Sequence, residues 1–256
     1  MMNFPRLVLW SGRQPVTLAL LLVGLWLLCM IFVPIANWVW GAAALRSLIV
    51  LSVVLQAGAV LAVVGAAWGW RYTLTVAFIV AIITFGVEYV GSHTGWPFGD
   101  YTYTELLRPQ IGNVPLLIPL AWLMMLPCAW AIAQPWRGRP WLFALISGLA
   151  LTAWDLFLDP QMAHWQLWVW QEPGGYFGIP WQNYWGWLLT GTLLTWFIRP
   201  RSVPTRPLLL IYSLTWFLET FGLAFFWGLT GPALVGGLVM GGIMVVGWRK
   251  RLTIDD

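Results

Sequence analysis

Long apolar runs separated by short polar segments dominate the chain. A helix needs about 20 mainly apolar residues to cross a bilayer, and the chain contains eight candidate runs, at approximately 15–36, 44–68, 72–91, 114–134, 141–158, 183–198, 207–227 and 231–248. The sixth run is short, so we expect this helix to be tilted or to start inside the preceding loop. The pattern predicts an all-α fold, a polytopic membrane helical bundle that forms a single domain over residues 1–256.

The composition agrees with a membrane protein. The chain is 60% hydrophobic and 9% charged, with a mean hydropathy of +0.77, whereas soluble domains contain about 25% charged residues. The first run follows Arg6 and Arg13, as the core of a signal peptide would. It is longer than the usual core of about 7–15 residues, and the segment PIANWVW offers no convincing cleavage site. We therefore expect the first run to remain a helix.

The basic residues predict the orientation. With the N-terminus inside, eleven of the 13 Lys and Arg residues lie on the cytoplasmic side, and only Arg46 and Arg108 lie outside. Because basic residues accumulate in cytoplasmic loops, we expect both termini to be cytoplasmic and the protein to be multi-pass in the inner (plasma) membrane. Topology then accounts for the formal charge of +4, and no nucleic-acid partner is expected.

The acidic residues gather on the opposite side. Apart from Asp255 and Asp256, all of them lie outside or in the outer half of a helix: Glu88, Asp100, Glu105, Asp155, Asp159, Glu172 and Glu219. At a rise of about 1.5 Å per residue, Glu88, Asp155 and Glu219 fall at one depth on three outward-running helices. Acids within the bilayer are costly and usually functional, so this convergence predicts a site. Each acid alone could instead reach interfacial water or pair with an outer arginine.

Two long outer connections are rich in Trp, Tyr, Gly and Pro: GSHTGWPFGDYTYTELLRPQIGNVP and DPQMAHWQLWVWQEPGGYFGIPWQNYW. Both are too long to be simple turns, so we expect them to fold back as a lid. Their side chains and those of the adjoining helices are candidates to line a pocket. The candidate binding residues are Trp96, Phe98, Tyr101, Tyr103, Trp154, Tyr176, Phe177, Trp181, Asn183 and Tyr184.

Cofactor and metal motifs are missing from the sequence. It contains no glycine-rich nucleotide loop, no His-x-x-x-His and no Cys-x-x-Cys, and its histidines are His93 and His164. We expect no metal, with a site built from the two histidines and the acids as a minor alternative. Cys29 and Cys128 fall at different depths of their helices, so no disulfide is expected.

Four segments within about residues 85–190 carry a resemblance: GWPFGDYTYT, VPLLIPLAWLMM, TAWDLFLDPQM and GGYFGIPWQNYWGWLLTG. They resemble, in order and separation, the integral-membrane carotenoid biosynthesis family that includes γ-carotene 1′,2′-hydratase and bisanhydrobacterioruberin hydratase. The resemblance implies a hydro-lyase without a cofactor that adds water to the terminal C1′,C2′ double bond of an acyclic ψ end group. Its implied partners are an acyclic or monocyclic carotenoid, membrane lipid and other carotenoid biosynthesis enzymes.

Hydration of such a double bond gives the acids a chemical role. The reaction needs a proton, a tertiary carbocation and then water. A carboxyl group in an apolar site can stay protonated near neutral pH, and an ionised one can steady the cation and deprotonate the water. We expect Asp155 to be the leading proton donor, with Glu88 or Asp159 as its partner and Glu219 completing the set.

Whether Asp159 shares a helix face with Asp155 depends on Pro160. If the helix persists to Pro160, the two acids lie at i and i+4 on one face. The residue before a proline disfavours the helical region, so Asp159 could instead turn into the loop. In either case we expect a closed apolar tunnel among the third, fifth and seventh helices, walled by both outer connections.

Two other functions fit the same residues. A lycopene-type cyclase would begin with the same protonation and quench the cation with a double bond of the substrate. A transporter or pigment-binding membrane protein would use the outer acids as a proton or cation relay. The inner halves of the helices contain no acids, which disfavours a path across the membrane.

Overall fold

A computed structural model describes residues 13–255 and contains eight α-helices. The helices are α1 Arg13–Trp40, α2 Ala42–Trp68, α3 Trp70–Thr94, α4 Leu117–Ala133, α5 Pro140–His164, α6 Trp181–Ile198, α7 Thr205–Phe225 and α8 Thr230–Asp255. Within the described residues, seven of the helices are long and apolar enough to cross a membrane, and α6, with 18 residues, is not among them. The predicted all-α polytopic bundle is confirmed, and the protein is a multi-pass membrane protein.

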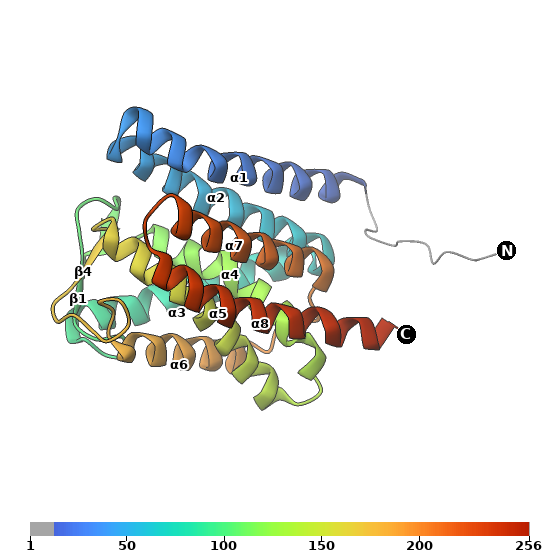
Figure 1. Ribbon diagram of the computed structural model, residues 1–256. Helices are drawn as coiled ribbons and strands as arrows, with labels where there is room; N and C mark the ends of the chain where they lie inside the picture. Colours follow the sequence, from blue (N-terminus) through green and yellow to red (C-terminus); the bar gives the residue numbers. More distant parts are fainter. Residues whose placement is uncertain (1–12, 256) are drawn as a thin grey trace.

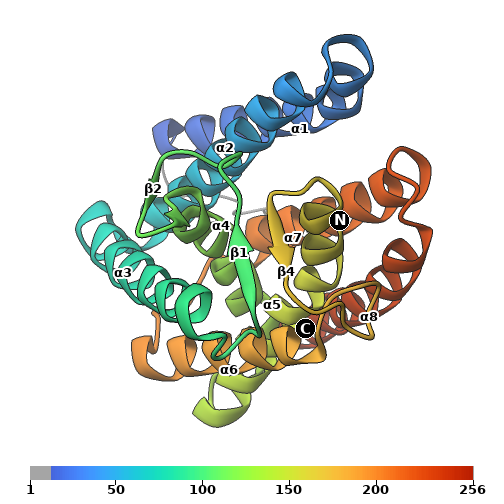
Figure 2. The same cartoon turned by 90° about the vertical axis from the view of Figure 1, so that its left-hand side faces the viewer.

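Helix α4 forms the centre of the bundle. It packs against α2, α3, α5, α7 and α8, and nearly all of its side chains are buried. Six of the other helices form close pairs around it, with α1 on α2, α5 on α6 and α7 on α8, and α3 packs mainly on α4 itself. Seen along the bundle, the α1–α2 pair and the α7–α8 pair lie on different sides of this centre (Figure 2).

The long connections meet at one end of the bundle, which we call the loop end. The described start of α1 and the end of α8 lie at the other end (Figure 1). Strand β1 (Tyr101–Tyr103) of the first connection pairs antiparallel with β4 (Trp168–Trp170) of the second, with Tyr103 opposite Trp168. A second small sheet pairs β2 (Gln110–Ile111) with β3 (Val114–Pro115). The two connections are thus joined into one cap over the loop end.

Helix α5 continues past Pro160 to His164. Proline has no N–H, so it leaves the carbonyl four residues earlier without its usual helical donor. Here that carbonyl belongs to Leu156, and the Tyr176 hydroxyl of the cap donates to it at 3.1 Å. A buried carbonyl in a membrane protein needs such a partner. The contact explains why α5 persists and keeps Asp155 and Asp159 four residues apart on one helix.

Glycines allow α5 and α6 to approach closely. A Cβ atom added at Gly148 of α5 would lie 2.8 Å from the Leu188 carbonyl oxygen of α6, and one added at Gly191 would lie 3.3 Å from the Gly148 Cα. Small residues at a helix interface allow this kind of packing in membranes. The close approach matters for the site because α6 carries Asn183, described below.

We expect Gly148→Ala to lower the free energy of unfolding by about 1–3 kcal/mol, the usual cost of overpacking. The added methyl group meets backbone atoms, which cannot rotate away. Gly86→Ala is the matched control, because Gly86 is an exposed helical glycine with no atom within 4 Å of an added Cβ. Thermal unfolding of both variants in one detergent checks this, and equal midpoints would contradict it.

Candidate active site

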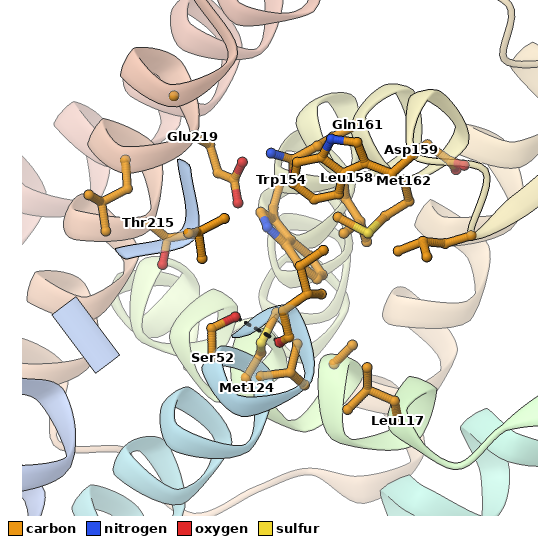
Figure 3. A pocket seen from close by; sticks show the side chains of 18 of the residues that line it. Ser52, Leu117, Met124, Trp154, Leu158, Asp159, Gln161, Met162, Thr215 and Glu219 are labelled. Atoms are coloured by element: carbon orange, nitrogen blue, oxygen red, sulfur yellow. Dashed lines mark hydrogen bonds between the residues drawn. The ribbon is translucent and has the colours of Figure 1, made fainter. Parts of the chain in front are cut away.

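A cavity of about 580 Å³ opens within the loop-end half of the bundle. Its walls come from the cap and from helices α1 to α7, with single residues or short stretches contributed by α3 and α6, and most of its lining side chains are apolar or aromatic (Figure 3). Three acids line it: Glu88, Asp159 and Glu219. The expected apolar space with acids in its wall is therefore present. It also reaches α1 and α2, and the prediction that it is closed is wrong, because several lining side chains of α1 and α7 are exposed.

Glu88 of α3 is buried and accepts three hydrogen bonds. The Tyr101 and Tyr103 hydroxyls donate to its Oε2 at 2.6 and 2.8 Å, and the Trp122 indole N–H donates to its Oε1 at 3.2 Å. Strand β1 supplies both tyrosines, since residues i and i+2 of a strand point to the same side. Three donors suit an ionised carboxylate, which can only accept.

The two tyrosines remain protonated donors. Burial raises the pKa of Tyr101 and of Tyr103 above the ordinary value for a phenol, and the nearby Glu88 charge raises both further. A hydroxyl in this environment keeps its proton throughout the physiological pH range. Tyr101 and Tyr103 of the cap thus hold the Glu88 carboxylate in place.

Asp155 and Asp159 share one neutral partner. The Asn183 side-chain amide, in the first turn of α6, donates to Asp155 Oδ2 at 2.8 Å and also to Asp159 Oδ2. Asp159 Oδ1 accepts from the Trp168 indole N–H at 2.6 Å, whereas Asp155 Oδ1 is buried and has no hydrogen-bond partner among residues 13–255. The two acids form a pair bridged by Asn183, with Asp159 tied additionally to β4.

The four expected catalytic acids differ in whether they reach the cavity. Asp155, the expected leading donor, is fully buried and does not line the cavity; Asp159 lines it, one helical turn away. Glu88 and Asp159 line the same cavity. Glu219 lines the cavity from α7, on the other side of Trp154 from Asp159 (Figure 3). Its Oε2 is buried, with no hydrogen-bond partner in the part of the chain that the structure describes.

Stacked indoles form part of the wall beside Glu88. Trp122 and Trp187 stack with ring centroids 4.1 Å apart and 4° between their planes, and Trp154 meets Trp187 edge-on at 5.9 Å. All three line the cavity. Indole faces attract positive charge, so this wall suits a cationic intermediate.

The expected binding residues divide into two groups. Phe98, Tyr101, Tyr103, Trp154 and Asn183 line the cavity. The other five are not in its wall: Trp96, Phe177 and Trp181 are exposed, and Tyr176 and Tyr184 are buried in a separate cluster with Leu156. Phe177 packs instead beside Gly231 at the start of α8, so this part of the cap covers helix ends rather than the cavity.

Sequence reasoning missed the walls formed by α1 and α2. The missed residues include Trp26, Met30, Ile31, Pro34, Ile35, Trp38, Ser52 and Gln56. Gln56 was the available signal, because it interrupts an apolar run; its amide donates to Thr215 Oγ1 at 3.0 Å. The α1 side chains gave no signal, since lipid-facing and cavity-facing apolar residues look alike.

The histidines, cysteines and acids of the described chain are dispersed. Over residues 13–255, no three His, Cys, Asp or Glu side chains are grouped so that they could hold a metal ion. Cys29 and Cys128 are free and buried in the structure.

The fold and the site define a multi-pass helical membrane protein with a largely apolar cavity and acids in its wall. A family model described as carotenoid biosynthesis protein matches residues 46–243, and the chain belongs to this family. The resemblance found in the sequence is thereby confirmed.

One curated relative is informative about this family. The bisanhydrobacterioruberin hydratase of Haloarcula japonica is 34% identical over 119 residues, which cover 44% of this chain and 40% of that protein. No solved structure matches the chain.

Proposed function

We propose that the protein is a carotenoid hydratase that adds water across the terminal C1′,C2′ double bond of an acyclic ψ end group. The observation that carries the proposal is that Asp159 and Glu88, each held by its own donors, line one apolar cavity beside stacked indoles. The name of the Haloarcula relative supports the same reaction class. We place the activity in the plasma membrane, with both termini cytoplasmic as the basic residues predict.

The aspartate pair is suited to deliver the proton. Asp155 and Asp159 are both buried, and their hydrogen-bond partners Asn183 and Trp168 are neutral. Two adjacent buried carboxyl groups cannot both be ionised, so such a pair keeps a proton between them. Asp159 is the member that reaches the cavity, and we assign it the transfer to the CH carbon of the double bond. Asp155 is then a positioning residue that shares the proton.

Glu88 and the indoles are suited to the steps that follow. Protonation leaves a tertiary cation at the dimethyl carbon, which the Glu88 carboxylate and the indole faces stabilise. A water oxygen then bonds to that carbon and gives one proton to Glu88. Return of this proton to the aspartate pair closes the cycle, so the reaction consumes one alkene and one water and forms one tertiary alcohol.

The product mass tests this proposal directly. In cells that make an acyclic carotenoid, we expect expression of the chain to yield a product heavier by one water for each end that reacts. A cyclase would change retention without changing mass, and a pigment-binding protein would leave the carotenoid unchanged. Cells expressing Asp159→Asn provide the matched control for background hydration.

A further inference from the structure

One wall of the cavity lies open at the molecular surface. Among the described residues, five lining side chains are exposed, and they come from α1, α7 or the residue after α7: Ile31 55%, Trp38 63%, Phe217 54%, Phe221 42% and Phe226 36%. Lining residues from the other elements are buried or half-buried, as are Phe98, Trp122 and Trp154. The cavity therefore reaches the exterior along α1 and α7.

A slit remains between α1 and α7 because each of them packs mainly against other helices. Helix α1 packs mainly on α2, whereas α7 packs on α8 and α4, and α1 and α7 are not a closely packed pair. Figure 2 shows the α1–α2 pair and the α7–α8 pair on either side of this region. At the loop end, Trp38 and Phe226 bridge the two helices edge-to-face, with ring centroids 5.5 Å apart.

The slit faces lipid rather than water. Both flanking helices are membrane-spanning candidates, and its surface continues along α7 as a row of rings, with Phe217 on Phe221 at 5.9 Å and Phe221 on Phe225 at 4.7 Å. A solute dissolved in the bilayer can reach such an opening without crossing the cap. A water-soluble solute would have to cross hydrocarbon first.

We propose that this slit is a lateral port through which an acyclic carotenoid enters the cavity from the bilayer, end first, and that the Trp38–Phe226 pair closes its outer end. The chain end would pass Glu219 and Trp154 before it reaches Asp159, following the order of these side chains in Figure 3. A linear polyene fits because the lining is apolar and aromatic along the way. The port rests on the proposed function for its class of ligand, an acyclic carotenoid, and does not depend on the reaction.

Gly222→Leu tests the port from the α7 side. Gly222 lines the cavity, and a Cβ added there meets only the Trp227 indole, at 3.7 Å, so a larger side chain is tolerated and narrows the slit. Gly242→Leu is the matched control, because Gly242 is exposed on α8, lies outside the cavity and has no atom within 4 Å of an added Cβ. The full-length protein in liposomes is mixed with vesicles carrying lycopene, and quenching of tryptophan fluorescence reports uptake. We expect uptake to slow by about tenfold in Gly222→Leu, since an extra side chain obstructs the path, and to be unchanged in Gly242→Leu.

Trp38→Ala tests the outer closure. Loss of the indole removes the bridge to Phe226, so we expect faster uptake of lycopene and faster release into empty vesicles. Trp40→Ala is the control, because Trp40 is on the same helix and 67% exposed but does not line the cavity.

The outcomes separate the port from the chemistry. Equal uptake rates for Gly222→Leu and wild type would overturn the port, as would a wild-type protein that takes up no lycopene. Uptake of a polyene-labelled phospholipid in place of lycopene would overturn the choice of ligand. Lycopene uptake that obeys these predictions, without any hydrated product, leaves the port standing and refutes the proposed function. A hydrated product together with lycopene uptake that Gly222→Leu does not change would refute the port and leave the proposed function standing.

Discussion

Asp159→Asn is expected to lower hydration by a factor of about 10²–10⁴, the contribution usual for general acid catalysis. The amide keeps the size of the side chain, and its oxygen can still accept from the Trp168 indole, which lies 2.6 Å from the carboxylate oxygen. Its NH₂ group cannot supply the transferable proton. Folded yield should change little, because an amide is easier to hold in a bilayer than a charge. The measurement is product formed per folded protein in cells that make an acyclic carotenoid.

Asp155→Asn is the matched control, because it makes the same chemical change one turn earlier on α5. Asp155 does not line the cavity, so this variant retains the acid that faces the substrate. It also removes the second carboxyl group that helps to keep the pair protonated. We therefore expect a smaller loss of activity than in Asp159→Asn, and a loss that a lower pH reduces. A second control is Glu219→Gln, which alters a cavity acid outside the Asn183-bridged pair. Near-normal specific activity in Asp159→Asn would contradict the assignment and move the donor to Asp155, Glu88 or Glu219.

The sequence predicted the helices well because the bilayer imposes a length on apolar runs. All eight expected runs correspond to helices. The pairing of β1 with β4 was not predictable, since it joins three-residue strands far apart in the chain. The sequence also could not show whether α5 continues past Pro160, for a similar reason. Its stabilising donor, Tyr176, comes from a distant part of the cap.

Sequence reasoning identified the acids of the site but not their arrangement. Acids stand out in an apolar chain because they are costly in the bilayer. Asp155 and Asp159 are one turn apart, so the sequence could not show which of them faces the cavity. Which aspartate faces the cavity depends on where α6 places Asn183 and where β4 places Trp168. The exposed wall along α1 and α7 depends in turn on which helices pack together, and no local sequence pattern indicates which helices do so.

Glu88→Gln should be as damaging as Asp159→Asn, for a different reason. The carboxylate accepts from the Tyr101 and Tyr103 hydroxyls and from the Trp122 indole, so its charge is held at one place beside the aromatic wall. The amide of the variant has no negative charge to stabilise the cationic intermediate, and it cannot act as the base for the attacking water. Removing one preorganised electrostatic group typically costs about 10²–10³ in rate. We expect a loss of that size in product per folded protein.

The tyrosines allow this electrostatic role to be separated from a structural one. Tyr101→Phe and Tyr103→Phe each remove one hydrogen bond to Glu88 while keeping the ring and the charge. A hydrogen bond to a charged group contributes about 1.5–3 kcal/mol, so each variant should lose stability on that scale and only part of the activity. Glu88→Asp keeps the charge but withdraws it by one methylene, and it should recover part of the activity that Glu88→Gln loses. If Glu88 only anchors the cap, then Glu88→Gln would lower thermal stability while the folded fraction kept its normal rate, and Glu88→Asp would offer no rescue of catalysis.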